Sequence, residues 1–131
     1  MKILIVEDEV SSRFLLKSFL SEYGECSLAE DGGKAAELFA TAVHAKEYYT
    51  LVILDVKLPV MDGMDVLKTI RKIEQESGIA PADGCKVIMC TALSDSGSVL
   101  RAFREQCEIY LTKPIEKQKL IDSMRKLKLI E

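Results

Sequence analysis

The sequence has no tryptophan and a single histidine among its 131 residues. His44 has no second histidine with which to bind a metal ion, and no serine or cysteine is paired with it for nucleophilic catalysis. We therefore interpret His44 as a structural or solvent-facing side chain. This interpretation disfavours histidine-based metal sites and hydrolases of the serine or cysteine type.

Cysteine motifs are also missing. The four cysteines show neither a C-x-x-C pair nor another spacing typical of metal ligands. Free cysteine is usually buried and packs as a small hydrophobic side chain. We predict this role for all four residues, Cys26, Cys85, Cys90 and Cys107.

Long hydrophobic runs and an excess of positive charge are lacking as well. No stretch approaches the ~18 apolar residues of a membrane helix, and the apolar run at residues 3–6 is too short for a signal peptide. Lysine and arginine are interspersed with acids, and the formal net charge is −3, so neither nucleic acid nor a membrane is an expected partner. These absences predict a cytoplasmic protein.

The composition indicates one compact domain. Hydrophobic residues make up 48% of the chain and charged residues 30%, which is typical of a chain of this length that buries a core. The chain ends soon after its last predicted helix, so we expect a single domain over residues 1–131 with no attached output domain. The widest irregular stretch, residues 77–84, contains glycine and proline and is interpreted as a surface loop.

Short apolar runs alternate with segments of helical period. This alternation predicts an α/β fold in which helices cover both faces of a parallel sheet. The predicted strands are residues 3–6, 27–29, 51–54, 87–90 and 109–111. The predicted helices carry their apolar residues within positions 15–23, 35–43, 66–73, 99–103 and 120–127.

Polar residues follow four of these strands. In an open parallel sheet the crossovers are right-handed, so the carboxyl ends of all strands lie at one edge, where ligands bind. Side chains that are far apart in the sequence should therefore meet at this edge. They comprise three acids, a hydroxyl and an amine: Glu7, Asp8, Asp55, Thr91 and Lys113.

Three carboxylates held together repel one another, and a divalent cation would relieve the repulsion. A ligand set of oxygens without histidine or cysteine suits Mg²⁺, which commonly shares a phosphate oxygen. Lys113 and Thr91 would then neutralise and hydrogen-bond the oxygens of a phosphoryl group. Asp55, which interrupts the apolar run of residues 51–56, is the expected nucleophile.

A simpler interpretation is that each acid starts a turn or caps the following helix, since aspartate is a favoured N-cap. That interpretation does not account for Asp55, which lies between Leu54 and Val56. It also leaves the joint occurrence of five such residues at the ends of four strands unexplained. We therefore favour a functional site.

Four stretches of the chain together match a known family. They are ILIVEDE at residues 3–9, LDVKLPVMDG at 54–63, VIMCTA at 87–92 and YLTKP at 110–114. With these stretches in this order, the whole chain resembles the response regulator receiver domains of two-component signalling, of the chemotaxis-regulator (CheY-like) type. The resemblance implies a flavodoxin-like (βα)5 three-layer sandwich whose five-stranded parallel sheet has the order 2-1-3-4-5 known for that type.

The resemblance also implies a metal site. Asp8 and Asp55 would bind Mg²⁺ directly, and the backbone carbonyl of Lys57 would be a third protein ligand. Glu7 would act through a bound water. Glu7 replaces the aspartate common at this position in the family, which adds one methylene to a residue near the metal.

For the phosphoryl group, the resemblance implies that Asp55 accepts it from a phosphohistidine of a histidine kinase or phosphotransfer protein. Lys113, with a cis peptide bond to Pro114, would contact the phosphoryl group, and Thr91 would hydrogen-bond it. The movement of Thr91 would vacate space for Tyr110. A face formed by the fourth helix, the fifth strand and the fifth helix would then contact an unidentified downstream protein, with the chain a monomer or a weak dimer.

The expected function is that of a stand-alone phosphoacceptor, or of a relay intermediate without its own output, and not of an enzyme beyond its own phosphotransfer and autodephosphorylation. A Mg²⁺-dependent phosphohydrolase that forms an aspartyl phosphate is the alternative. Such enzymes place a second carboxylate two residues after the nucleophile, where this chain has Lys57. A further hypothesis is that Lys57 and Leu93 restrict the hydrolytic water and prolong the lifetime of the phosphoryl group.

Overall fold

The computed structural model describes residues 1–92, 97, 101 and 107–131. The strands form one parallel sheet in the order β2-β1-β3-β4-β5, as the resemblance implies. Their bounds are β1 (Lys2–Val6), β2 (Glu25–Ala29), β3 (Leu51–Asp55), β4 (Lys86–Thr91) and β5 (Ile109–Thr112). The predicted α/β fold class is confirmed.

The described helices are α1 (Val10–Leu20), α2 (Gly32–His44), α3 (Gly63–Glu76) and α5 (Lys117–Lys126), with a short 3₁₀ turn η1 (Pro81–Asp83). The fourth predicted helix, with Val99, Leu100 and Phe103, falls outside the described residues. Within the described part of the chain, no helix has the length and apolar character needed to cross a membrane.

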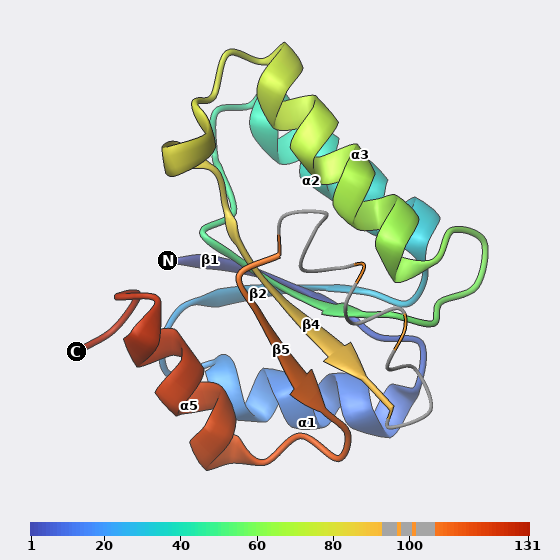
Figure 1. Cartoon of the computed structure of the whole chain (residues 1–131), viewed down its shortest axis with the longest axis vertical. Coiled ribbons are helices and arrows are strands. Elements are labelled where there is room, and N and C mark those ends of the chain that lie inside the picture. The colour runs from blue at the N-terminus through green and yellow to red at the C-terminus, as the bar shows by residue number, and fades with distance from the viewer. Residues whose placement is uncertain (93–96, 98–100, 102–106) are drawn as a thin grey trace.

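Helices α1 and α5 cover one face of the sheet, and α2 and α3 cover the other (Figure 1). The central strands β1 and β3 are apolar on both faces, because successive side chains of a strand point in opposite directions. Ile3 and Ile5 pack in the core beneath α1 and α5, whereas Leu4 and Val6 pack beneath α2 and α3. The run of apolar residues thus builds two cores from one strand.

Aspartate side chains cap the starts of two helices. Asp31 caps α2 by accepting from the backbone N–H of Lys34 at 2.7 Å, and Asp62 caps α3 by accepting from that of Asp65 at 3.0 Å. Asp55 caps no described helix, because α3 begins eight residues later, at Gly63. The simpler interpretation of Asp55 as a capping residue is therefore wrong.

Several details differ from the sequence prediction. β2 begins at Glu25 and Cys26 is only partly buried, because β2 is an edge strand of the sheet. Tyr23 lies beyond the end of α1, and Leu15, on the predicted apolar stripe, is 50% exposed. His44 is exposed at the end of α2, as predicted, and the other three cysteines are buried.

Candidate functional site

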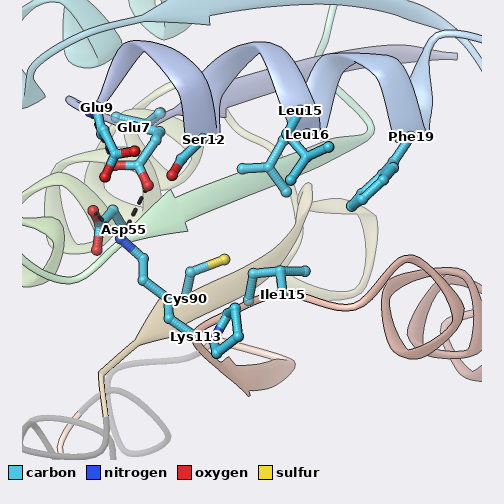
Figure 2. Close-up of a pocket in the computed structure, with 12 residues that line it drawn as sticks. Glu7, Glu9, Ser12, Leu15, Leu16, Phe19, Asp55, Cys90, Lys113 and Ile115 are labelled. Atoms are coloured by element: carbon cyan, nitrogen blue, oxygen red, sulfur yellow. Dashed lines mark hydrogen bonds and ion pairs between the residues drawn. The ribbon is translucent and has the colours of Figure 1, made fainter.

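The five predicted side chains come to the same edge of the sheet. Glu7 and Asp8 follow β1, Asp55 ends β3, Thr91 ends β4 and Lys113 follows β5. The Nζ atom of Lys113 lies 2.7 Å from Oδ2 of Asp55 and 2.9 Å from Oε1 of Glu7 (Figure 2). Residues from three strands therefore share one ion-pair network.

Lys113 is the positive charge of this network. Asp55 and Glu7 are 6% and 2% exposed, so water screens their attraction to the ammonium group only weakly. Burial alone would lower the pKa of Lys113, but hydrogen bonds and charge from Asp55 and Glu7 outweigh burial and raise it above its ordinary value. Lys113 therefore remains protonated at any physiological pH.

Glu7, Asp8 and Asp55 can each turn a carboxylate oxygen toward a common point, since these atoms lie within 4.8 Å of one another. Asp8 is exposed overall, but partial desolvation of its carboxylate, its hydrogen bond with Glu7 and the charge of Glu7 raise its pKa. Lys113 compensates one of the three negative charges, and the remaining charge matches a divalent cation. The donor set therefore fits a hard metal ion.

Two residues that the sequence reasoning missed shape this site. Arg13 donates from Nη1 to the backbone carbonyls of Glu7 and Asp8, at 2.9 and 3.4 Å. A side chain on Gly63 would place its Cβ 2.1 Å from the carbonyl oxygen of Asp55, so this glycine allows α3 to approach the end of β3. No spacing rule indicates Arg13, and the motif at residues 54–63 contains Gly63 without indicating this packing role.

Cys90 and Thr91 are the last two residues of β4, where Cys90 pairs with Asp55 of β3. The hydroxyl of Thr91 is buried and donates to the carbonyl of Ala92 at 3.1 Å. Burial, followed by the charge of Asp55, raises the pKa of the Cys90 thiol to about 12. The thiol is therefore neutral and a poor nucleophile.

The remaining predicted residues lie around the site. Lys57 is exposed in the segment after β3. Tyr110 lies on β5, the outermost strand next to β4, where it pairs with Met89 and is 40% exposed. Lys113 and Pro114 are joined by a cis peptide bond, as the resemblance implies. Leu93 lies outside the described residues, so its predicted role beside the hydrolytic water has no structural counterpart here.

Comparison with known proteins shows which family the chain resembles. The family model for the response regulator receiver domain matches residues 3–125. Peroxide stress-activated histidine kinase mak3 of Schizosaccharomyces pombe is 35% identical over 123 residues, which are 92% of this chain and 5% of that protein. Chemotaxis protein CheY of Bacillus subtilis is 28% identical over 127 residues, 95% of each chain. The chain thus spans a small part of the kinase and nearly all of CheY.

Among solved structures, similarity is found to the co-crystal structure of the Saccharomyces cerevisiae histidine phosphotransfer protein Ypd1 and the receiver domain of its downstream response regulator Ssk1. The TM-score is 0.82 at 27% sequence identity, and the match covers 96% of this chain and 87% of that chain.

Proposed function

The chain belongs to the response regulator receiver family, and from this premise we propose that Asp55 accepts a phosphoryl group from the phosphohistidine of a histidine kinase or phosphotransfer protein in the cytoplasm. The contact of Lys113 Nζ with Asp55 Oδ2 at 2.7 Å, beside the three-carboxylate cluster, supports this proposal most directly. Receiver domains are phosphoacceptors rather than classical enzymes.

Transfer of the phosphoryl group needs a nucleophile, and it needs a cation beside the phosphoryl oxygens that gain negative charge. One carboxylate oxygen of Asp55 forms the bond to phosphorus as the bond from phosphorus to the donor imidazole breaks, and the electron pair leaves with the imidazole nitrogen. Lys113 is already protonated and placed to contact a phosphoryl oxygen. The Thr91 hydroxyl would turn from the carbonyl of Ala92 to donate to another oxygen.

Mg²⁺ is the cofactor of this proposal. Asp8 and Asp55 would hold it directly, with the backbone carbonyl of Lys57, and Glu7 would reach it through a water. When bound, the ion neutralises phosphoryl oxygens in the transition state. The chain's own part is to hold the acids together beside Lys113.

Mg²⁺ should also stabilise the folded chain. At a concentration ten times its dissociation constant, it is expected to raise the free energy of unfolding by about 1.4 kcal/mol. Asp8→Ala should lose this increase, because it removes one ligand oxygen. Asp83→Ala, which alters an exposed acid in η1, should keep it. Urea denaturation with and without Mg²⁺ measures the difference, and an equal increase in both variants would place the ion elsewhere.

Phosphorylation would reach the surface through Thr91 and Tyr110. Movement of the Thr91 hydroxyl toward the phosphoryl group leaves space beside β4, and Tyr110 on the neighbouring β5 could turn into it. This change would alter the face that includes β5 and α5, to which a downstream protein would bind. The same chemistry would serve a relay in which the phosphoryl group passes to a second protein.

Two exposed apolar residues of α1, Val10 and Phe14, are the expected contact with the phosphodonor protein. Val10 and Phe14 are 58% and 53% exposed, and α1 starts next to the acidic cluster. Phe14→Ala is expected to slow transfer from a phosphorylated histidine phosphotransfer protein about tenfold, because aromatic anchors dominate such contacts. Its rate with acetyl phosphate should not change, because a small donor makes no contact there.

Tyr48→Ala is the matched control for this experiment. Tyr48 is a similarly exposed aromatic residue, but it lies in the segment between α2 and β3. This segment is at the amino-terminal ends of the strands, whereas the site is at their carboxyl ends. Tyr48→Ala should leave both rates unchanged. A Phe14→Ala variant that accepts phosphoryl groups from the protein donor at the wild-type rate would contradict the assignment of α1 as the docking helix.

The direct test of the proposed function is incubation with acetyl phosphate and Mg²⁺, followed by intact mass spectrometry. We expect the mass of one phosphoryl group to be added, and we expect a chelator of Mg²⁺ to prevent the addition. An unmodified chain after incubation with Mg²⁺ would overturn the proposal. The phosphohydrolase alternative is not proposed, because position 57 carries an exposed lysine instead of the required acid.

A further inference from the structure

A groove of about 380 Å³ opens from the phosphoacceptor site and follows α1 (Figure 2). One end contains Asp55 and Lys113. At the other end, Leu15, Leu16 and Phe19 point from α1 toward the segment after β5. The residues that line this second end are all apolar: Leu15, Leu16, Phe19, Cys90, Pro114 and Ile115.

The groove exists because the segment between β5 and α5 leaves part of α1 uncovered. Leu15 remains 50% exposed, and Phe19 and Ile115 are only partly buried. From Ser12, at the polar end, to Phe19 the helix advances seven residues, or about 10 Å. Transfer of a phosphoryl group alone requires no apolar cleft of this length.

We propose that this groove binds the acyl chain of an acyl phosphate, so that Asp55 is phosphorylated by donors with apolar chains of about four to six carbons in preference to acetyl phosphate. The inference rests on the proposed phosphorylation of Asp55. It assigns a substrate class to a surface that the phosphoryl group itself does not use.

The distribution of charge argues for this occupant. The anionic phosphate end of the ligand would meet Lys113, which is paired with Glu7 and Asp55. The negative charge of Glu7, Glu9 and Asp55, which line the same end, would be balanced by the Mg²⁺ of the proposed function. The tail would meet only apolar side chains, so a donor with a charged or strongly polar tail would lose hydration without gaining a partner. A molecule with one phosphate end and one apolar end matches both halves of the groove.

The reaction is balanced without a further reactant. A carboxylate oxygen of Asp55 forms a bond to phosphorus while the bond between phosphorus and the acyl oxygen breaks. The electron pair stays with that oxygen, and the donor leaves as a carboxylate. The length of the acyl chain would change how tightly the donor binds, but the same bonds would form and break.

The experiment compares acetyl, butyryl and hexanoyl phosphate at equal concentrations well below saturation, with Mg²⁺ present. A fully buried methylene favours binding about fourfold, and the open groove buries the chain in part, so hexanoyl phosphate is expected to react about tenfold faster than acetyl phosphate. Equal rates for the three donors would overturn the proposal while leaving phosphorylation of Asp55 intact. Failure of every donor would overturn the proposed function as well.

Two variants test the groove itself. Leu15→Ala and Phe19→Ala should bring the rate with hexanoyl phosphate to within about twofold of the rate with acetyl phosphate, because each substitution removes part of the apolar lining of the groove. Tyr48→Ala is the matched control, since Tyr48 is an exposed aromatic residue that does not line the groove. It should retain the preference. Leu15 is half exposed, so its substitution leaves the core intact if Phe19→Ala fails to fold.

Binding of an unreactive analogue gives a readout that does not depend on turnover. Hexylphosphonate is expected to bind about tenfold more tightly than methylphosphonate, and its titration should shift the backbone amide resonance of Ile115 in the wild-type protein. The Leu15→Ala variant should bind both phosphonates alike. Equal affinity of the wild-type protein for the two phosphonates would overturn the proposal and leave the groove to an apolar side chain of a partner protein.

Discussion

Asp55→Asn is expected to abolish labelling by acetyl phosphate, with a loss of more than about a thousandfold in rate. The amide has nearly the same shape as the carboxylate, but it lacks the anionic oxygen that forms the bond to phosphorus. Lys113 keeps its ion pair with Glu7 at 2.9 Å in this variant, so the site retains its main internal contact. Intact mass spectrometry after incubation with Mg²⁺ and acetyl phosphate measures the loss.

Asp83→Asn provides the control for this loss. It makes the same chemical change at an exposed acid of η1, which lies outside the site, and should be labelled like the wild-type chain. A label of equal stoichiometry on Asp55→Asn would show that another side chain accepts the phosphoryl group. Circular dichroism of both variants separates lost chemistry from lost fold.

The sheet and the site were predictable from sequence for one physical reason. The apolar runs of β1 and β3 are continuous because both faces of these strands are buried, and such strands lie in a parallel sheet. Parallel strands deliver their carboxyl ends to one edge, so Glu7, Asp55 and Lys113 could be expected to meet. Their contacts at 2.7 and 2.9 Å confirm that expectation.

Features that depend on how a helix is rotated on the sheet were not predictable. Helical period placed Leu15 on the apolar stripe, but the path of the chain after β5 leaves it half exposed. Arg13 reaches the carbonyl of Glu7 through a contact that depends on the same rotation. The apolar groove therefore appears only when the strands and helices are assembled.

A second charged cluster lies outside the functional site and has no signal in the sequence. Arg71 of α3 donates from Nη1 to Glu74 Oε1 and to the carbonyl of Cys85, both at 2.8 Å, and from Nη2 to Glu108 Oε1 at 3.0 Å. Glu74 in turn accepts from the backbone N–H of Cys85 at 2.7 Å, which fixes the chain just after the loop at residues 77–84. The cluster joins residues up to 37 positions apart.

Arg71 compensates one buried acid, Glu74, and one partly buried acid, Glu108. The side chains of Glu74 and Glu108 are 7% and 25% exposed. Burial raises the pKa of Glu108 above its ordinary value, although the N–H of Val87 and the charge of Arg71 act in the opposite direction. Without the guanidinium group, the buried Glu74 and the partly buried Glu108 would both lose their ion pair with Arg71.

Arg71→Met is therefore expected to lower the free energy of unfolding by about 3–5 kcal/mol, the usual cost of leaving a buried charge without its partner. Urea denaturation measures this loss. Arg125→Met is the control, because Arg125 forms an i,i+3 pair with Asp122 at 3.3 Å but both side chains are about half exposed, at 50% and 51%. It should cost less than about 1 kcal/mol. Equal losses in the free energy of unfolding in the two variants would contradict the role assigned to burial. Adding Glu74→Gln and Glu108→Gln to Arg71→Met should restore part of the stability.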